Sequence, residues 1–181
     1  MKNISVCIFY LMAIGILSFL VGRIVPKKWF RYDRFPYRLF GFEKGGQVYR
    51  AAGICRWKST FPDMSAIFPK LIPSKKLPGT VNATHVERMI QETCIAEATH
   101  FLLGVLGFGC VLFWNTAEGM ILAILYALGN IPYIMIQRYN RPKLVLILDR
   151  LRDKERRHLC PRMEPIHEES YHFELQHGTR A

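Results

Sequence analysis

Apolar residues are concentrated in three long runs along the chain, and the segments between the runs are polar. The runs cover residues 4–25, 98–114 and 120–136. A helix that crosses the apolar core of a bilayer needs about 20 apolar residues, with a range of about 17 to 25. The pattern therefore predicts an all-α integral membrane protein with about three transmembrane helices, at residues 4–25, 98–114 and 120–137.

The first run could instead be a secretory signal peptide, because Lys2 supplies a charged start. Its apolar part is too long for such a peptide, however, and no small-x-small cleavage site follows it. The next residues, GRIVPKKWF, are typical of a helix leaving a membrane, with Lys27, Lys28 and Trp29 at the level of the headgroups. We therefore interpret the first run as a membrane span.

Basic residues are distributed unevenly around the three runs. All 25 Lys and Arg residues except Lys2 lie between Arg23 and Arg88 or between Arg138 and Arg180, and the connection at 115–119 carries none. Because cytoplasmic loops carry an excess of Lys and Arg, the pattern predicts an amino terminus outside the cell and a cytoplasmic interfacial region over 26–97. The carboxyl end is then cytoplasmic, and the protein is expected in the cell membrane as a multi-pass protein.

The net charge of +11 allows two interpretations. Aromatic residues alternate with basic ones between Lys27 and Phe42, a pattern that can stack on nucleic acid bases. Beside three membrane spans the same pattern favours aromatic side chains at the bilayer interface and basic ones on lipid phosphates. We therefore expect membrane lipids, and no nucleic acid, as partners.

Neither the cysteines nor the carboxyl-terminal tail is expected to form a metal site. The five Cys residues are odd in number and include no Cys-x-x-Cys pair, which favours reduced thiols. The tail over 159–181 contains His167, His172 and His177 among acidic residues, a composition that could chelate a metal. A flexible, solvated cytoplasmic tail is the favoured interpretation.

Polar residues gather on one face of the helix that leads into the second span. This helix is predicted to begin near Thr84, because Thr84 and Glu87 have the spacing of a capping box. At 100° per residue, one face carries Glu92, Thr93, Glu97 and His100. Two carboxylates and an imidazole therefore stand together at the entrance to the membrane.

The third span has a polar stripe of its own, formed by Tyr126, Asn130, Tyr133 and Gln137. Polar groups inside a bilayer are costly unless they find partners, so we expect the two polar faces to pack together. They could serve only to hold the helices to each other. Because an imidazole held by a carboxylate suits acid–base chemistry, the predicted catalytic residues are His100, Glu97, Glu92, Asn130 and Gln137.

A basic segment follows the third span. Asn140 is predicted to cap a new interfacial helix over 141–158, with Pro142 at its first position and an apolar side on the membrane. Arg138 and Arg141 can bind lipid phosphates there. Alternatively, they bind a phosphate or carboxylate of a substrate.

Several sequence blocks of the chain occur together in a known family. They are ERMIQET...AE..H, NIP...QRYNRPKL...L.RL and, upstream, RIVPKKWFR, FEK.G and RWK. In these blocks the chain resembles the bacterial glycosyl-4,4′-diaponeurosporenoate acyltransferase family over roughly residues 20–158. The resemblance implies a single membrane domain over 1–158 that esterifies a sugar hydroxyl of a glycosylated carotenoid with a fatty acyl chain.

The leading hypothesis is that an acyl thioester donor, either acyl-CoA or an acyl-carrier thioester, and a lipid-soluble acceptor react in the membrane, with no other cofactor. His100 would remove the hydroxyl proton, Glu97 or Glu92 would orient its ring, and Asn130 or Gln137 would bind the oxyanion. The expected substrate-binding residues are Arg138, Asn140, Arg141, Lys44, Glu43, Trp57 and Lys58.

Two features of the sequence leave the chemistry open. The chain lacks the His-x-x-x-x-Asp pair of the common glycerolipid acyltransferases, since Val105 stands where the acid would be. Glu97 and His100 have the spacing of a metal-binding Glu-x-x-His pair, but the pair occurs without a second copy, so no metal is expected. The other functions considered are a non-catalytic membrane subunit or lipid-binding scaffold, and a different reaction on a polyprenoid or sterol-like lipid.

Overall fold

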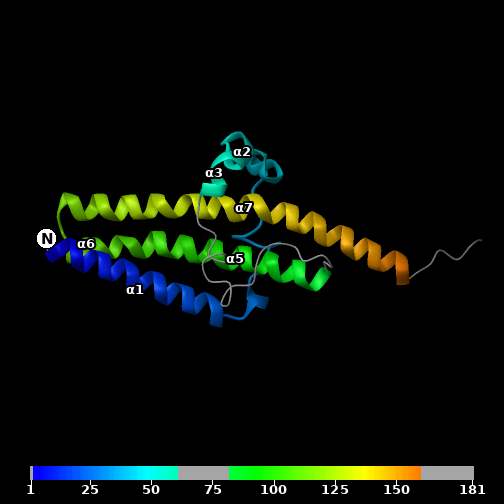
Figure 1. The fold of residues 1–181 in the computed structure, drawn as a ribbon, viewed down its shortest axis with the longest axis horizontal. Coiled ribbons are helices and arrows are strands. Elements are labelled where there is room, and N and C mark those ends of the chain that lie inside the picture. The colour runs from blue at the N-terminus through cyan, green and yellow to red at the C-terminus, as the bar shows by residue number, and fades with distance from the viewer. Residues whose placement is uncertain (1, 61–81, 160–181) are drawn as a thin grey trace, which may run out of the picture.

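The computed structural model describes residues 2–60 and 82–159, and its main elements are three long helices. These are α1 (Lys2–Ile24), α5 (Ala83–Leu106) and α7 (Ala117–Leu159). The helix α5 lies between α1 and α7, and all three run side by side (Figure 1). A 3-10 turn, η4 (Gly107–Gly109), and the short helix α6 (Cys110–Phe113) prolong α5 up to the connection with α7.

In the described part of the chain, three helices are long and apolar enough to cross a membrane. They cover Asn3–Ile24, Ala83–Phe113 and Ala117–Arg157. Large apolar side chains point away from the protein on all three, including Leu17, Leu112 and Leu125, each more than half exposed. Such a surface is expected where lipid replaces water. The predicted number of candidate spans is confirmed.

A glycine and a hydrogen bond bring the three long helices into close contact. A side chain at Gly107 would place its Cβ 2.5 Å from the ring of Tyr126, so only glycine lets α7 approach at this level. At the same end of the molecule, the hydroxyl of Tyr10 on α1 donates a hydrogen bond of 2.7 Å to the carbonyl of Leu106. These contacts fix α1 and α7 on opposite sides of α5.

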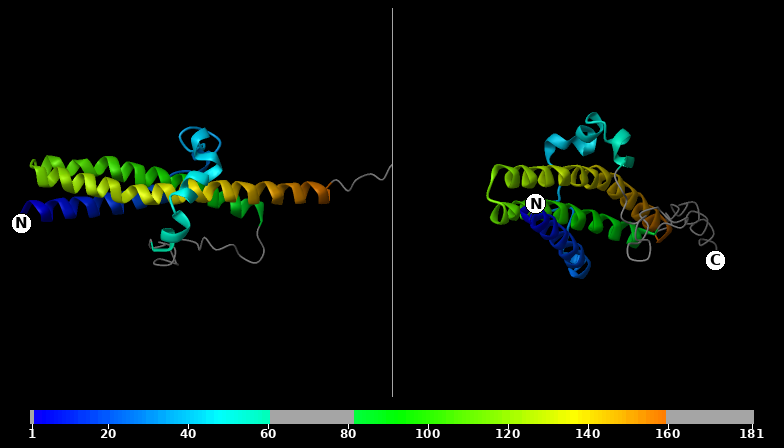
Figure 2. Two further views of the ribbon diagram at one scale, coloured as in Figure 1. Left: turned by 90° about the horizontal axis from the view of Figure 1, so that it is seen from above. Right: turned by 60° about the vertical axis from the view of Figure 1, so that its left-hand side comes forward.

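The described part of the segment between α1 and α5 forms short elements that lie against α5 and α7. They are η1 (Lys27–Trp29), η2 (Gly41–Gly46), α2 (Gln47–Ala51), α3 (Ile54–Trp57) and η3 (Lys58–Thr60). The right-hand view of Figure 2 shows α2 and α3 standing out to one side of the long helices. Tyr49 and Ile54 pack against Tyr139 of α7 and anchor these elements.

Two helix boundaries differ from the sequence-based expectation. The helix α5 begins after Asn82, whose side chain accepts a hydrogen bond of 2.7 Å from the amide of His85, so the cap is Asn82 and not Thr84. The helix α7 continues through Pro142 without the expected break at Asn140.

A proline removes one hydrogen bond from a helix interior and often bends the helix. Figure 1 shows α7 bending in its carboxyl-terminal part. Contacts of Arg138 and Arg141 with α5 and the upstream segment hold α7 just before Pro142. Apart from Leu159, the predicted flexible tail over 159–181 lies outside the described residues.

Candidate functional site

The polar faces of α5 and α7 meet, as predicted, and His100 takes part in the contact. The Nδ1 atom of His100 lies 2.9 Å from Oδ1 of Asn130, and Nδ2 of Asn130 donates a bond of 2.9 Å to the carbonyl of Tyr126. The second bond fixes the orientation of the amide, so Oδ1 must accept and Nδ1 of His100 must carry a hydrogen. In the neutral ring, Nε2 therefore bears the lone pair.

Tyr133 restricts the ring of His100 from a second side. The two rings are stacked, with centroids 4.5 Å apart and an angle of 9° between their planes. Asn130 is buried and His100 is half-buried. The imidazole is thus held in one orientation by a hydrogen bond and a stacking contact, both from α7.

A buried network of charged groups lies next to His100, toward the start of α5. We call it the Arg–Glu network, and it consists of Glu43, Glu97, Arg138 and Arg141. Arg138 joins its two carboxylates, because Nε and Nη2 donate to Glu43 at 2.6 and 2.8 Å while Nη1 donates to Glu97 at 2.5 Å. Its guanidinium also donates to the carbonyls of Pro36 and Arg38, each at 3.2 Å.

Arg141 completes the network from the next turn of α7. It donates to the second oxygen of Glu97, to the hydroxyl of Thr93 at 3.0 Å, and to the carbonyl of Tyr37 at 2.6 Å. Two cations and two carboxylates balance in charge, and Glu43 and Arg141 are 0% and 2% exposed. A buried ion pair of this kind is tolerated because each charge has both a counter-charge and hydrogen bonds.

Glu43 enters the network from η2, far from the other members in sequence. Burial alone would raise the pKa of its carboxyl, but hydrogen bonds from Arg138, Tyr49 and the Phe40 amide lower the pKa below its ordinary value. For Tyr49, burial and its hydrogen bond to Glu43 raise the pKa to about 12. The carboxylate therefore stays ionised and the phenol stays protonated at neutral pH.

The remaining predicted site residues lie at several levels of the structure. Glu92 forms an ion pair with Lys27 of η1, with 2.7 Å between Nζ and the carboxylate. Gln137 is buried on α7, and Asn140 is half-buried on the same helix.

The upstream candidates belong to the short elements. Lys44 is exposed at the end of η2, and the indole of Trp57 donates to the carbonyl of Ala52 at 3.1 Å. Lys58 lies 5.3 Å above the ring of Tyr139. In the described part of the chain, no three His, Cys, Asp or Glu side chains gather closely enough to hold a metal ion.

Sequence reasoning placed Glu97 beside His100 but missed the partners of the charged groups. Glu43 and Arg138 are 95 residues apart, and the carbonyl of Tyr37 is 104 residues from Arg141. No local pattern identifies such partners. The block FEK.G named Glu43 as a site residue, but it gave no sign that Glu43 is buried.

Residues 26–150 match the sequence family described as glycosyl-4,4'-diaponeurosporenoate acyltransferase. The chain belongs to this acyltransferase family. Two relatives bear the same name, one from Staphylococcus aureus strain Newman and one from the bovine strain RF122 / ET3-1. Each is 30% identical over 161 residues, which cover 87% of this chain and 94% of the relative. No solved structure matches the chain significantly.

The part of the chain that matches the glycosyl-4,4'-diaponeurosporenoate acyltransferase family contains both parts of the site. The Arg–Glu network and the His100–Asn130 pair fall within residues 26–150, whereas α1 ends before them. The chain is therefore a member of an enzyme family, and its most enclosed polar groups lie in the region that family members share.

Proposed function

We propose that this protein is a membrane acyltransferase that moves a fatty acyl group from a thioester donor to a hydroxyl of a lipid in the bilayer. The acceptor is proposed to be a sugar hydroxyl of a glycosylated carotenoid or a similar lipid, in keeping with the names of the relatives. The observation that carries the proposal is His100, whose Nε2 lone pair is set by Asn130 between two candidate spans.

In the proposed reaction, the acceptor hydroxyl enters between the helices and gives its proton to Nε2 of His100. Its oxygen attacks the thioester carbonyl, the carbon–sulfur bond breaks, and the imidazolium returns the proton to the leaving thiolate. Asn130 accepts a hydrogen bond from Nδ1 throughout and so stabilises the imidazolium. Gln137 is the proposed donor to the oxyanion.

The carboxylates are proposed to position the helices and not to contact the substrates. Glu97 lies three residues before His100 on α5 and is bonded to Arg138 and Arg141, so its proposed role is to fix α5 against α7. Glu92 is proposed to fix α5 against η1, just after α1, through Lys27. Contact of either arginine with an anionic part of the donor stays a prediction, as it does for Lys44, Asn140, Trp57 and Lys58.

The donor is proposed to arrive from the cytoplasm. The start of α1 and the α6–α7 connection lie at the same end of the molecule (Figure 1), and the loop at 115–119 has no basic residue. The positive-inside rule then assigns that end to the outside. The Arg–Glu network lies toward the opposite, basic end. That end is proposed to face the cytoplasm, where acyl thioesters are made.

The test compares His100→Ala with a matched control, His85→Ala, in membranes with equal protein content. Loss of a general base lowers kcat by about 10²–10⁴-fold, so His100→Ala should lose nearly all transfer of a labelled acyl group to a glycosylated acceptor. The control removes an imidazole about four turns away on the same helix and should keep its activity. Full activity of His100→Ala would exclude this mechanism.

A further inference from the structure

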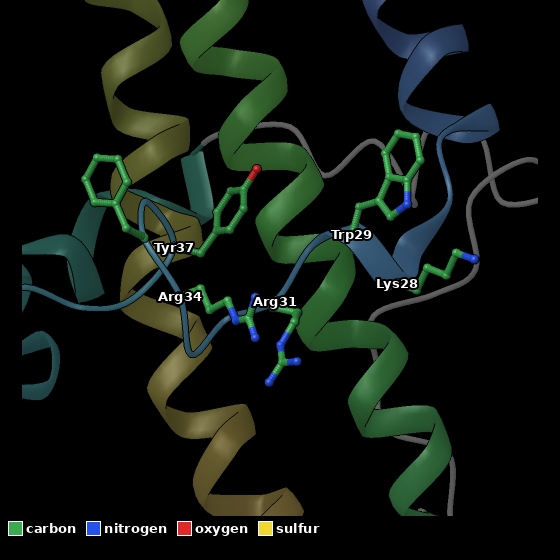
Figure 3. A pocket seen from close by; sticks show the side chains of 6 residues that line it. Lys28, Trp29, Arg31, Arg34 and Tyr37 are labelled. Carbon is green, nitrogen blue, oxygen red and sulfur yellow. The ribbon is translucent and has the colours of Figure 1, made fainter.

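A pocket lies where the chain leaves α1, outside the site described above. Its cavity volume is about 320 Å³, and it is lined by Lys28, Trp29, Arg31, Arg34, Phe35 and Tyr37. Figure 3 shows Trp29 and Tyr37 on either side of the segment that carries Arg31 and Arg34, in front of α5. The pocket thus combines basic side chains with aromatic rings.

The basic side chains leave an excess of positive charge at the pocket. Arg31 is paired with Asp33, with 2.8 Å between Nη2 and Oδ2. No carboxylate among the described residues pairs with Lys28 or Arg34. Three cations against one carboxylate favour an anionic ligand, and arginine suits phosphate because its guanidinium donates two parallel hydrogen bonds.

Two aromatic side chains of the pocket have exposed rings. Trp29 is 70% exposed and Phe35 is 82% exposed, so both rings can be covered by a ligand. Tyr37 is held in place, because its ring packs on that of Phe30 with centroids 5.8 Å apart and its carbonyl accepts a bond from Arg141. Stacking of a base on an aromatic ring contributes about 1–3 kcal/mol.

We propose that this pocket binds the nucleotide end of the donor, the adenosine 3′,5′-bisphosphate part of a coenzyme A thioester; this rests on the proposed acyl transfer. Lys28 and Arg34 bind the phosphates, and the exposed ring of Trp29 stacks on the adenine. The cavity volume falls at the lower end of the range of about 300 to 1,000 Å³ for small-ligand sites, which is enough for the head of the donor but not for its arm.

The position of the pocket connects it to the proposed site of transfer. The carbonyl of Tyr37 accepts a hydrogen bond from Arg141, and Arg141 also donates one to the hydroxyl of Thr93 on α5. From Thr93 to His100 the rise along α5 is about 10 Å. The extended pantetheine arm of coenzyme A exceeds that length, and the proposal places its thioester near His100.

The phosphate of an anionic phospholipid could occupy the same cationic side chains, but it has no base to stack. The experiment therefore measures binding of adenosine 3′,5′-bisphosphate to the purified full-length protein in nanodiscs made with or without phosphatidylglycerol. Inorganic phosphate is the competitor that lacks the base. Unfolding midpoints are recorded for every variant to show that it is folded.

The variants separate the pocket from general surface charge. Arg34→Ala should weaken binding about tenfold or more, since a hydrogen bond to a charged group contributes about 1.5–3 kcal/mol. Trp29→Ala should weaken binding by about fivefold or more, since stacking of a base contributes about 1–3 kcal/mol. Arg56→Ala removes an exposed arginine from α3 and should change the dissociation constant less than about twofold. With acyl-CoA as donor, Arg34→Ala should raise KM and leave kcat nearly unchanged.

Three results would overturn the proposal. The first is no binding of the bisphosphate, and the second is equal weakening by Arg34→Ala and Arg56→Ala. The third is displacement of the bisphosphate by phosphatidylglycerol or inorganic phosphate at similar concentrations, which would mean that the pocket recognises phosphate alone. Acyl transfer that continues without such binding would refute the pocket and keep the proposed function. If the bisphosphate binds in a manner that depends on Arg34 but the protein shows no acyl transfer, the pocket is kept and the proposed function is refuted.

Discussion

Glu43→Gln removes one negative charge from the Arg–Glu network while keeping the shape of the side chain. Each oxygen of Glu43 accepts two hydrogen bonds, one from Arg138 and one from either Tyr49 or the Phe40 amide. A glutamine has only one such oxygen, and its NH₂ group would face two donors in either orientation. The substitution therefore leaves both a charge and hydrogen-bond donors without partners in a closed interior.

The size of the effect follows from burial. Glu43 is 0% exposed and Arg138 is 7% exposed, so water cannot replace the missing carboxylate. Removing one partner of a buried ion pair costs about 3–5 kcal/mol. In a chain of this length, each 1 kcal/mol lowers the unfolding midpoint by about 2–4 °C. We expect Glu43→Gln to lower the midpoint by about 6–20 °C.

Thermal unfolding in detergent, followed by tryptophan fluorescence, measures this shift. The matched control is Glu87→Gln, which makes the same chemical change in an exposed pair, with 3.5 Å between Glu87 and Arg152. Exposed pairs contribute about 1 kcal/mol or less, so the control should shift the midpoint by no more than about 4 °C. Equal shifts for the two variants would refute the reasoning from burial.

The pH dependence of stability gives a second measure of the same carboxyl. Its pKa is lower in the folded protein than in the unfolded chain, where it is about 4.3. Ionised Glu43 therefore stabilises the fold above that pH, and the contribution is lost as the pH falls through the folded-state pKa. Between about pH 7 and about pH 3, the midpoint of the wild type should fall further than that of Glu43→Gln. Parallel curves would contradict this assignment.

Three further predictions concern other parts of the molecule. In a background without native cysteines, a cysteine placed at Asn115 should react with an impermeant thiol reagent from outside the cell and one at Ser59 should not; the reverse labelling would invert the proposed orientation. Arg138→Lys and Arg141→Lys should each lower the thermal unfolding midpoint and kcat, because one ammonium cannot replace a bidentate guanidinium. A raised KM with unchanged kcat would instead indicate that the arginine binds the donor directly. A hydrogen bond from Tyr139, together with nearby Lys143, lowers the pKa of the exposed Cys55 thiol. After brief alkylation near pH 7, mass spectrometry should therefore find Cys55 modified before the three buried cysteines of the described residues, and equal labelling would count against this assignment.

Local sequence was sufficient for features that depend on one helix alone. The three candidate spans follow from the length of the apolar runs, and the polar faces of α5 and α7 follow from helical periodicity, which fixes the direction of every side chain relative to its neighbours. His100 and Asn130 could be predicted to face each other for that reason. The fixed orientation of the imidazole followed only from the atoms around it, since a periodic pattern does not specify which nitrogen bonds to which oxygen.

Only the tertiary structure decided which groups share a site. In sequence, Glu97 was the expected partner of His100, but in the folded protein its oxygens are bonded to Arg138 and Arg141. The partner that completes the network, Glu43, comes from a short element 95 residues before Arg138. Helical periodicity carries no information across such a distance. The pairing depends instead on how the upstream segment packs across α7, where a buried charge is stable only beside its counter-charge.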